Sequence, residues 1–193
     1  MRRERSARPK PELLTIGHGS SDRAELAARL HDAGVQALVD VRRFPGSRHN
    51  PDVRSEALSA WLPPTGVSYR WDERLGGRRR MPPDTPSLDP WWREKSFRAY
   101  AAHTRTTPFA DAMTELAAAG GDTFTVVMCS ESVWWRCHRR LIADVAVLAY
   151  GMTVRHLMPN GDMIVHPVSD GARCSADGLL TWDRRVLPLV LPA

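Results

Sequence analysis

Short apolar runs alternate with amphipathic segments along most of the chain. Three of these runs have the composition of buried strands: residues 13–17 (LLTIG), 37–41 (ALVDV) and 123–128 (TFTVVM). Between the first two, Asp22 and Glu25 have the spacing of a capping box, and Gly34 stands where the helix would end. This succession of strand, helix and strand predicts a βαβ unit with parallel strands and a right-handed crossover.

Further elements continue the alternation. We expect helices at residues 55–62, 96–103, 107–119 and 133–150, strands at 67–71 and 153–158, and two short strands after the turn at Asn160-Gly161. Residues 72–90 are rich in proline and form a long irregular loop, which in a compact domain is usually functional or mobile. The whole pattern predicts an α/β fold, with a mostly parallel, Rossmann-like sheet flanked by helices in a single domain.

Three parts are expected along the chain: a basic, flexible N-terminus at residues 1–10, the α/β domain at 11–160, and an extension packed on the same domain at 161–193. The first segment has no apolar core behind it, unlike a secretory signal, and the apolar runs are too short to span a membrane. We therefore expect a cytoplasmic protein with no membrane partner. Three cysteines are too few, and odd in number, for a disulfide framework.

The charge balance is basic. The chain has 27 Lys and Arg residues against 22 Asp and Glu, a formal net charge of +5, and its only lysines are Lys10 and Lys95. Arginine binds phosphate through a planar fork and stacks on bases. These features favour an anionic partner, which we expect to be nucleic acid, DNA rather than RNA. They do not indicate an oligomeric state.

In a parallel sheet, ligands bind beside the loops that leave the carboxyl ends of the strands. His18 and Ser20 follow the first predicted strand, and Asp40 and Arg42 lie at the end of the second. The strand at 123–128 leads into a further group of reactive and polar residues: Cys129, Glu131, Trp134, Cys137, His138 and Arg139. The predicted fold therefore collects these residues at one edge of the sheet.

The same region contains several short motifs. They are Thr15-Ile16-Gly17-His18 with Ser20, Asp40-Val41-Arg42 with Pro45 and Ser47, Leu75-Gly76-Gly77, Ser96-Phe97-Arg98-Ala99-Tyr100, and Cys129-Ser130-Glu131 followed by Cys137-His138-Arg139. In this combination the chain resembles the domain-of-unknown-function family numbered 488, from about residue 13 to residue 158. The resemblance implies the fold and this set of site residues, whereas the family name supplies no reaction.

The motifs do not match the signatures of common cofactors. Gly17 and Gly19 begin a dinucleotide-binding pattern, but Asp22 stands where its third glycine belongs and would repel a pyrophosphate. A zinc site is not expected either, because the adjacent Cys137 and His138 would point about 100° apart on a helix. We therefore expect no cofactor and no metal, and we expect Cys137 to be a small core residue.

Two carboxylates, Asp40 and Glu131, follow buried strand residues, where an unpaired charge is costly. Each can pair with a neighbouring arginine, Arg42 or Arg139, and so hold loops together. Alternatively, both face one pocket. There they would suit cleavage of an N-glycosidic bond through a cationic, oxocarbenium-like transition state, with His18 as the proton donor.

Substrate contacts are expected from three kinds of side chain: arginines for phosphate, one member of each adjacent tryptophan pair for stacking, and polar groups of the motifs. The predicted set is Ser20, Arg42, Ser47, Arg78, Arg79, Trp92, Cys129, Trp134, His138 and Arg139.

The hypothesis that uses most of these features is a metal-independent, DNA glycosylase-like hydrolase of the base-excision repair type. Its catalytic residues would be Glu131, Asp40 and His18. Two alternatives stay open. One is a cysteine-dependent enzyme acting on a small anionic substrate, with Cys129 as nucleophile and Glu131 and His138 as auxiliaries. The other is a non-catalytic nucleic-acid-binding module.

Overall fold

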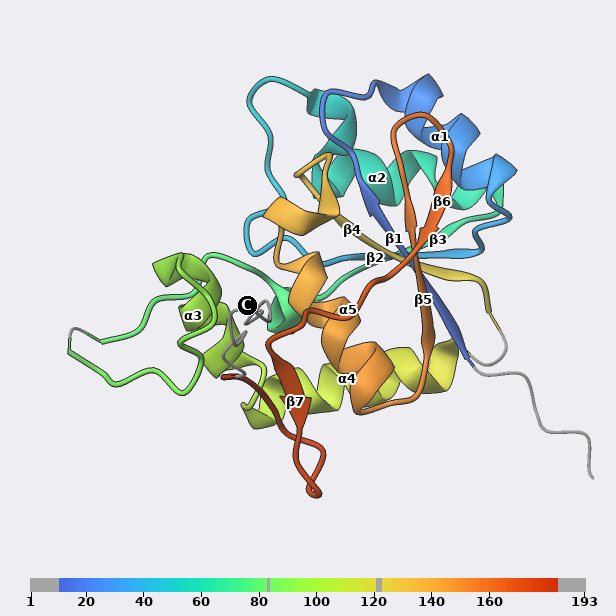
Figure 1. Ribbon diagram of the computed structural model, residues 1–193. Helices are drawn as coiled ribbons and strands as arrows, with labels where there is room; N and C mark the ends of the chain where they lie inside the picture. The colour runs from blue at the N-terminus through green and yellow to red at the C-terminus, as the bar shows by residue number, and fades with distance from the viewer. Residues whose placement is uncertain (1–10, 83, 121–122, 184–193) are drawn as a thin grey trace, which may run out of the picture.

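A six-stranded sheet forms the centre of the protein (Figure 1). The computed structural model describes residues 11–82, 84–120 and 123–183. In the order β3-β2-β4-β1-β5-β6, the strands are Ser68–Trp71, Ala37–Asp40, Thr125–Cys129, Glu12–Gly17, Thr153–Leu157 and Met163–Val165. The first five run parallel, and β6 pairs antiparallel with β5 after the turn at Asn160-Gly161. The predicted α/β class and mostly parallel sheet are confirmed.

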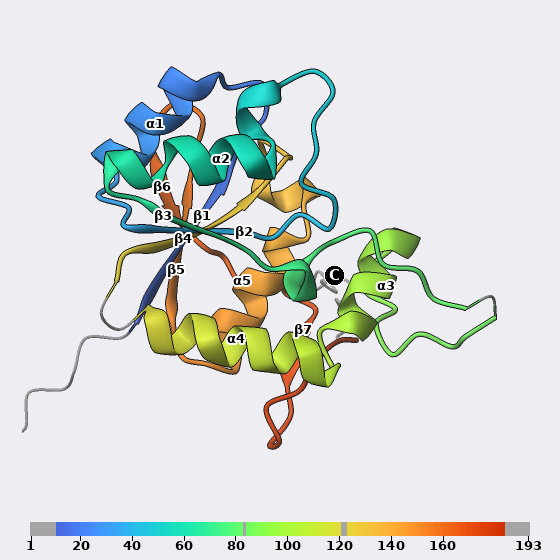
Figure 2. The ribbon, with the colours of Figure 1, turned by 180° about the vertical axis from the view of Figure 1, so that it is seen from behind.

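Helices cover both faces of the sheet (Figures 1 and 2). On one face lie α1 (Arg23–Asp32) and α2 (Ser55–Trp61), and on the other α4 (Thr107–Ala119) and α5 (Arg139–Leu148), with α3 (Lys95–His103) leading into α4. Short 3-10 turns occur at Pro51–Val53 (η1), Pro63–Thr65 (η2), Glu73–Leu75 (η3) and Trp134–Arg136 (η4). The central strands β1, β2 and β4 are buried between the layers, which explains why their sequences are mostly apolar.

The predicted βαβ unit is present, but another strand separates its two strands. Asp22 caps α1 through a complete capping box: its carboxylate accepts from Glu25 N at 2.9 Å, and the Glu25 carboxylate accepts from Asp22 N at 3.2 Å. β1 and β2 are parallel but not adjacent, because β4 lies between them. The carboxyl end of β4 is therefore flanked by the carboxyl ends of β1 and β2.

Residues 133–150 do not form the single helix predicted from the sequence. The turn η4 is followed by Cys137 in an extended conformation (φ −122°, ψ 150°), and α5 begins only at Arg139. Cys137 and His138 therefore precede the helix rather than lie on it. The argument that their side chains point about 100° apart, and so cannot share a ligand, is wrong because it assumed helical geometry.

The described part of the C-terminal extension packs on the same domain. Its strands β7 (Ala172–Cys174) and β8 (Leu180–Trp182) pair antiparallel. Trp182 is fully buried, and its Nε1 donates to the Asp144 carboxylate on α5 at 2.8 Å. The basic segment 1–10 lies outside the described residues. Within the described ranges, no helix has both the length and the apolar character needed to cross a bilayer.

Candidate active site

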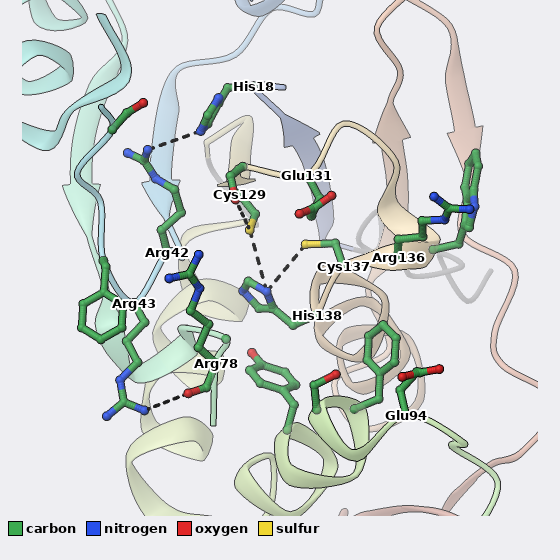
Figure 3. Close-up of a pocket in the computed structure, with 18 of the residues that line it drawn as sticks. His18, Arg42, Arg43, Arg78, Glu94, Cys129, Glu131, Arg136, Cys137 and His138 are labelled. Carbon is green, nitrogen blue, oxygen red and sulfur yellow. Dashed lines mark hydrogen bonds between the residues drawn. The ribbon is translucent and has the colours of Figure 1, made fainter. Parts of the chain in front are cut away.

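A cavity of about 590 Å³ opens at the carboxyl ends of β1, β2 and β4, where the strand order predicts a ligand site (Figure 3). Its volume is within the usual range of ligand pockets. Five separate stretches of chain line it: His18; Arg42, Arg43, Phe44, Gly46 and Ser47; Gly77 and Arg78; Glu94, Ser96, Phe97 and Tyr100; and residues 129–131 and 135–138.

Two cysteines and a histidine converge in this cavity. His138 Nδ1 lies 3.8 Å from Cys129 Sγ and 3.6 Å from Cys137 Sγ. On the other side of the ring, Nε2 lies 3.0 Å from the carbonyl oxygen of Val41, which can only accept. Nε2 therefore carries the proton of the neutral imidazole, and the lone pair of Nδ1 faces the two sulfur atoms.

The two thiols and Arg139 form one electrostatic unit. Burial opposes ionisation of Cys137, but the neighbouring Cys129 thiol and the Arg139 guanidinium outweigh it and lower the pKa of Cys137. Arg139 Nε also donates to Cys137 Sγ at 3.4 Å. The pKa of Cys129 is raised by its neighbour Cys137 and by burial. If one of the two thiols is ionised, the negative charge therefore resides on Cys137. The sequence had suggested Cys129 as the nucleophile.

The carboxylate of Asp40 lies beneath the cavity in a closed ion pair. It is fully buried and accepts from Arg42 Nε at 2.8 Å. The backbone N–H of Arg42 and the hydroxyl of Tyr69 also donate to it, at 3.1 Å each. The expectation that Asp40 faces the cavity as a catalytic residue is therefore wrong, because these donors occupy both of its oxygens. Asp40 instead positions Arg42, whose side chain forms part of the cavity wall.

His18 is a neutral residue of the cavity wall. Its Nδ1 lies 2.9 Å from the carbonyl oxygen of Gly19 and therefore carries the proton, while Nε2 accepts from Arg42 at 3.4 Å. Burial, and then the charge of Arg42, lower the pKa of His18 to about 4. At neutral pH the ring holds no second proton to release, so the geometry does not support His18 as the proton donor.

Glu131 is the predicted catalytic carboxylate that does reach the cavity. Its side chain is exposed and directed toward the same hollow as the two sulfur atoms (Figure 3). Arg139 binds only the backbone of this residue, by donating to the Glu131 carbonyl oxygen. Among the residues that the structure describes, no side chain pairs with the Glu131 carboxylate. Of the two alternatives for Glu131, the ion pair with Arg139 is not formed, which leaves this carboxylate available to a ligand.

Arginines and aromatic rings surround the opening. Arg43, Arg78 and Arg136 all line it. Phe44 and Trp135 also line it and have 63% and 44% of their surface exposed, so their rings are available for stacking. A rim of this kind suits a ligand that carries both phosphate and a planar ring.

Two of the sequence motifs meet at the cavity. Tyr100 on α3 donates its hydroxyl to the Leu75 carbonyl at 2.6 Å, and its ring packs against His138 with centroids 4.9 Å apart. A Cβ atom at Gly77 would lie only 2.8 Å from His138 Nδ1, so the loop approaches this ring closely. The motif at 75–77 thus forms part of the cavity, and the motif at 96–100 holds it in place.

Five of the predicted substrate contacts line the cavity, and five do not. Those that do are Arg42, Ser47, Arg78, Cys129 and His138. Ser20 is exposed outside it, and Arg79 donates to three carbonyls of the preceding residues 73–76, at 2.6, 2.8 and 3.4 Å. Trp92 and Trp134 are buried in the core, and Arg139 is buried beneath the cavity wall.

Five residues that line the cavity are absent from the predicted set: Arg43, Phe44, Glu94, Trp135 and Arg136. Three more belong to the sequence motifs but had no predicted substrate contact: Phe97, Tyr100 and Cys137. A signal existed for Trp135, since only one member of an adjacent tryptophan pair can face the core. The buried member is Trp134, which stacks on His156 with centroids 4.2 Å apart. For Glu94 the signal was its place beside the motif at 96–100, since it is the N-cap residue of α3.

A family model described as the domain of unknown function DUF488 matches residues 22–146. Comparison with curated proteins and with solved structures gives no match. The matched range runs from the N-cap of α1 into α5 and contains the motifs at 40–47, 75–77, 96–100 and 129–139. Because it covers more than half of the 193 residues, the chain belongs to the DUF488 family.

Proposed function

We propose that the protein is a hydrolase that acts at a nucleobase of a nucleic acid, with DNA glycosylase-like chemistry. The observation that carries the proposal is the Glu131 carboxylate, which enters a cavity with an arginine rim and has no partner among the described residues. Guanidinium groups bind backbone phosphates. The exposed ring of Trp135 offers a surface on which a base taken out of its stack can lie.

Glu131 supplies the negative charge that this cleavage needs. As the bond between sugar and base breaks, the sugar becomes positively charged, and a nearby carboxylate stabilises that state. The same carboxylate can accept a proton from the attacking water. Asp40 contributes indirectly, because its ion pair holds Arg42 in the cavity wall.

Turnover of defined oligonucleotides tests the proposal. Single strands and duplexes carrying deaminated, alkylated or oxidised bases are incubated with the protein; alkaline strand cleavage reports abasic sites, and mass spectrometry reports released bases. We expect Glu131→Gln to slow product formation by about 100-fold or more. The matched control is Glu56→Gln, at an exposed carboxylate on α2 outside the cavity, and it should retain full activity.

Two outcomes contradict the proposal. Undiminished turnover by Glu131→Gln would remove this residue from the chemistry. Salt-sensitive binding without turnover of any of these substrates would instead indicate a nucleic-acid-binding module.

A cysteine-dependent enzyme acting on a small anionic substrate is the second candidate. It is favoured by the convergence of Cys129, Cys137 and the Nδ1 lone pair of His138 in the cavity. An imidazole lone pair beside a thiol is the arrangement that activates a cysteine nucleophile. In that case iodoacetamide inactivates the enzyme, substrate protects it, and Cys137→Ser abolishes an activity that Glu131→Gln retains.

A further inference from the structure

Cys129, Cys137 and His138 form a cluster in which the three ligand atoms all lie within 4.8 Å of one another. Cys129 is the last residue of β4, and the other two occupy the non-helical break between η4 and α5. This break turns two adjacent side chains toward one point (Figure 3). We propose that these residues bind a Zn²⁺ ion and leave a fourth coordination position open to the cavity.

The two distances between sulfur and nitrogen fit tetrahedral coordination. With Zn–S bonds of about 2.3 Å and a Zn–N bond of about 2.0–2.1 Å, a sulfur and a nitrogen ligand are separated by about 3.6 Å. Nδ1 of His138 lies 3.6 Å from Cys137 Sγ and 3.8 Å from Cys129 Sγ. Both sulfur–nitrogen distances match this value. The two sulfur atoms lie within 4.8 Å of each other, and tetrahedral coordination brings them to about 3.8 Å.

The groups around the cluster also match a metal site. A histidine ligand usually donates its other ring N–H to a carbonyl or carboxylate, and Nε2 of His138 lies 3.0 Å from the Val41 carbonyl. The N–H···S bond from Arg139 stabilises a Cys137 thiolate. Because a Cβ atom at Gly77 would lie 2.8 Å from His138 Nδ1, glycine at this position keeps the ligand nitrogen accessible.

The ligand set selects the metal. Two thiolates and an imidazole favour Zn²⁺, whereas Mg²⁺ and Ca²⁺ take oxygen ligands. Structural zinc sites have four protein ligands, while catalytic sites have three and keep one position for water or substrate. All three residues of the cluster line the cavity, so the open position faces the space that a substrate would occupy.

The reaction that a bound Zn²⁺ ion would support here rests on the proposed function. A water molecule in the open position would give a proton to Glu131, and the resulting hydroxide would attack the sugar carbon that carries the base. Glu131 would then return the proton to the departing base. The C–N bond breaks, C–O and N–H bonds form, and one water is consumed without oxidation or reduction.

Metal binding can be measured without substrate. The full-length protein is stripped with a chelator under reducing conditions and titrated with Zn²⁺ against a chromophoric chelator, and separately with Co²⁺. We expect one ion per chain, with the thiolate-to-cobalt absorption and visible bands typical of a tetrahedral site. Cys129→Ser, Cys137→Ser and His138→Gln should each weaken Zn²⁺ binding by about 100-fold or more. Cys174→Ser, at a free cysteine on β7 outside the cluster, is the control and should bind Zn²⁺ as the wild type does.

A second measurement needs no variant and is therefore independent of folding defects. The wild-type protein is labelled with iodoacetamide with and without Zn²⁺, and each cysteine is quantified by peptide mass spectrometry. Protection of Cys129 and Cys137, while Cys174 stays reactive, supports the site. Equal labelling of Cys129 and Cys137 in both samples, or unchanged Zn²⁺ affinity in the two serine variants, overturns it.

The two proposals fail separately. Zinc binding by a protein that turns over none of the oligonucleotide substrates overturns the proposed function alone. Turnover that depends on Glu131 in protein that binds no Zn²⁺ overturns the metal site alone.

Discussion

Arg78 is a rim residue held in an unfavourable backbone conformation. Its φ is +54°, in the left-handed region that costs a non-glycine residue about 1 kcal/mol. Backbone strain of this kind persists at sites where a side chain serves a ligand. Because glycine adopts this conformation freely, we expect Arg78→Gly to leave thermal stability unchanged or raised. Loss of the guanidinium should weaken binding of an oligonucleotide by about tenfold.

Thermal unfolding and fluorescence anisotropy with a labelled oligonucleotide measure the two effects of Arg78→Gly. Arg93→Ala removes the same charge from an exposed position outside the cavity and serves as the control. Equal weakening of binding by the two variants would mean that net charge, rather than the rim, determines affinity.

At the scale of single residues, the sequence predicted location better than role. His18, Arg42, Cys129 and Glu131 were placed correctly, because the ends of parallel strands meet at one edge of a sheet. For Asp40 the sequence left two roles open, and the ion pair with Arg42 is the one that forms. The choice between them depends on donors from elsewhere in the fold, such as the Tyr69 hydroxyl. A sequence motif does not show which hydrogen-bond donors from other parts of the fold will contact its side chains.

At the scale of elements, the end of β1 packs directly on the loop that carries Glu131. A Cβ atom at Gly17 would lie 1.9 Å from the Glu131 carbonyl oxygen, so Gly17→Ala must displace this loop. We expect the free energy of unfolding to fall by about 1–3 kcal/mol and turnover to decrease. Denaturant unfolding checks the first effect. Gly46→Ala is the matched stability control, since its Cβ would meet no atom within 4 Å, and equal stability of both variants would show that the loop adapts without cost.

Whole elements were predictable where local signals agree, as in the capping box of α1. Residues 133–148 contain no glycine or proline, so their sequence favours an uninterrupted helix. The interruption at Cys137 coincides with a tertiary contact, the stacking of Trp134 on His156 of β5. Helix propensity is a weak signal that such packing overrides, and the convergence of Cys137 and His138 was missed for the same reason.

At the scale of the whole molecule, a buried network of hydrogen bonds joins the sheet, α5 and the C-terminal segment. Thr15 contacts His156 at 2.7 Å, His156 contacts His166 at 2.9 Å, and His166 contacts Asp144 at 2.9 Å. Hydrophobic alternation predicted one domain with a packed extension, because burial patterns are local. The alternation did not predict this hydrogen-bond network, because its residues come from separate parts of the sequence and meet only after folding.

This buried hydrogen-bond network makes the free energy of unfolding depend on pH. Burial, followed by His166 and Arg139, lowers the pKa of His156 from 6.5 to about 3. Between these values the unfolded chain binds a proton that the folded protein excludes, so stability is complete above about pH 6.5 and falls toward pH 3. At pH 5 we expect a loss of about 2 kcal/mol from this residue.

Denaturant unfolding at pH 7 and pH 5 measures that loss of stability. The His156→Gln variant should be less stable than the wild type at pH 7 but should lose less on acidification. If acidification lowers the stability of both proteins equally, His156 is not the responsible group.

The dependence of nucleic-acid affinity on salt tests most directly whether the arginine rim binds phosphates. Each phosphate contact with a single strand contributes about 0.7 to the slope of log K against log salt concentration. Arg43→Ala/Arg136→Ala removes two rim arginines, and Arg23→Ala/Arg93→Ala removes the same charge from two exposed positions outside the cavity. We predict that the rim variant has a slope shallower by about 1.4, while the control keeps that of the wild type. Equal slopes for the two variants, or binding by the wild type that does not change with salt, would contradict the account.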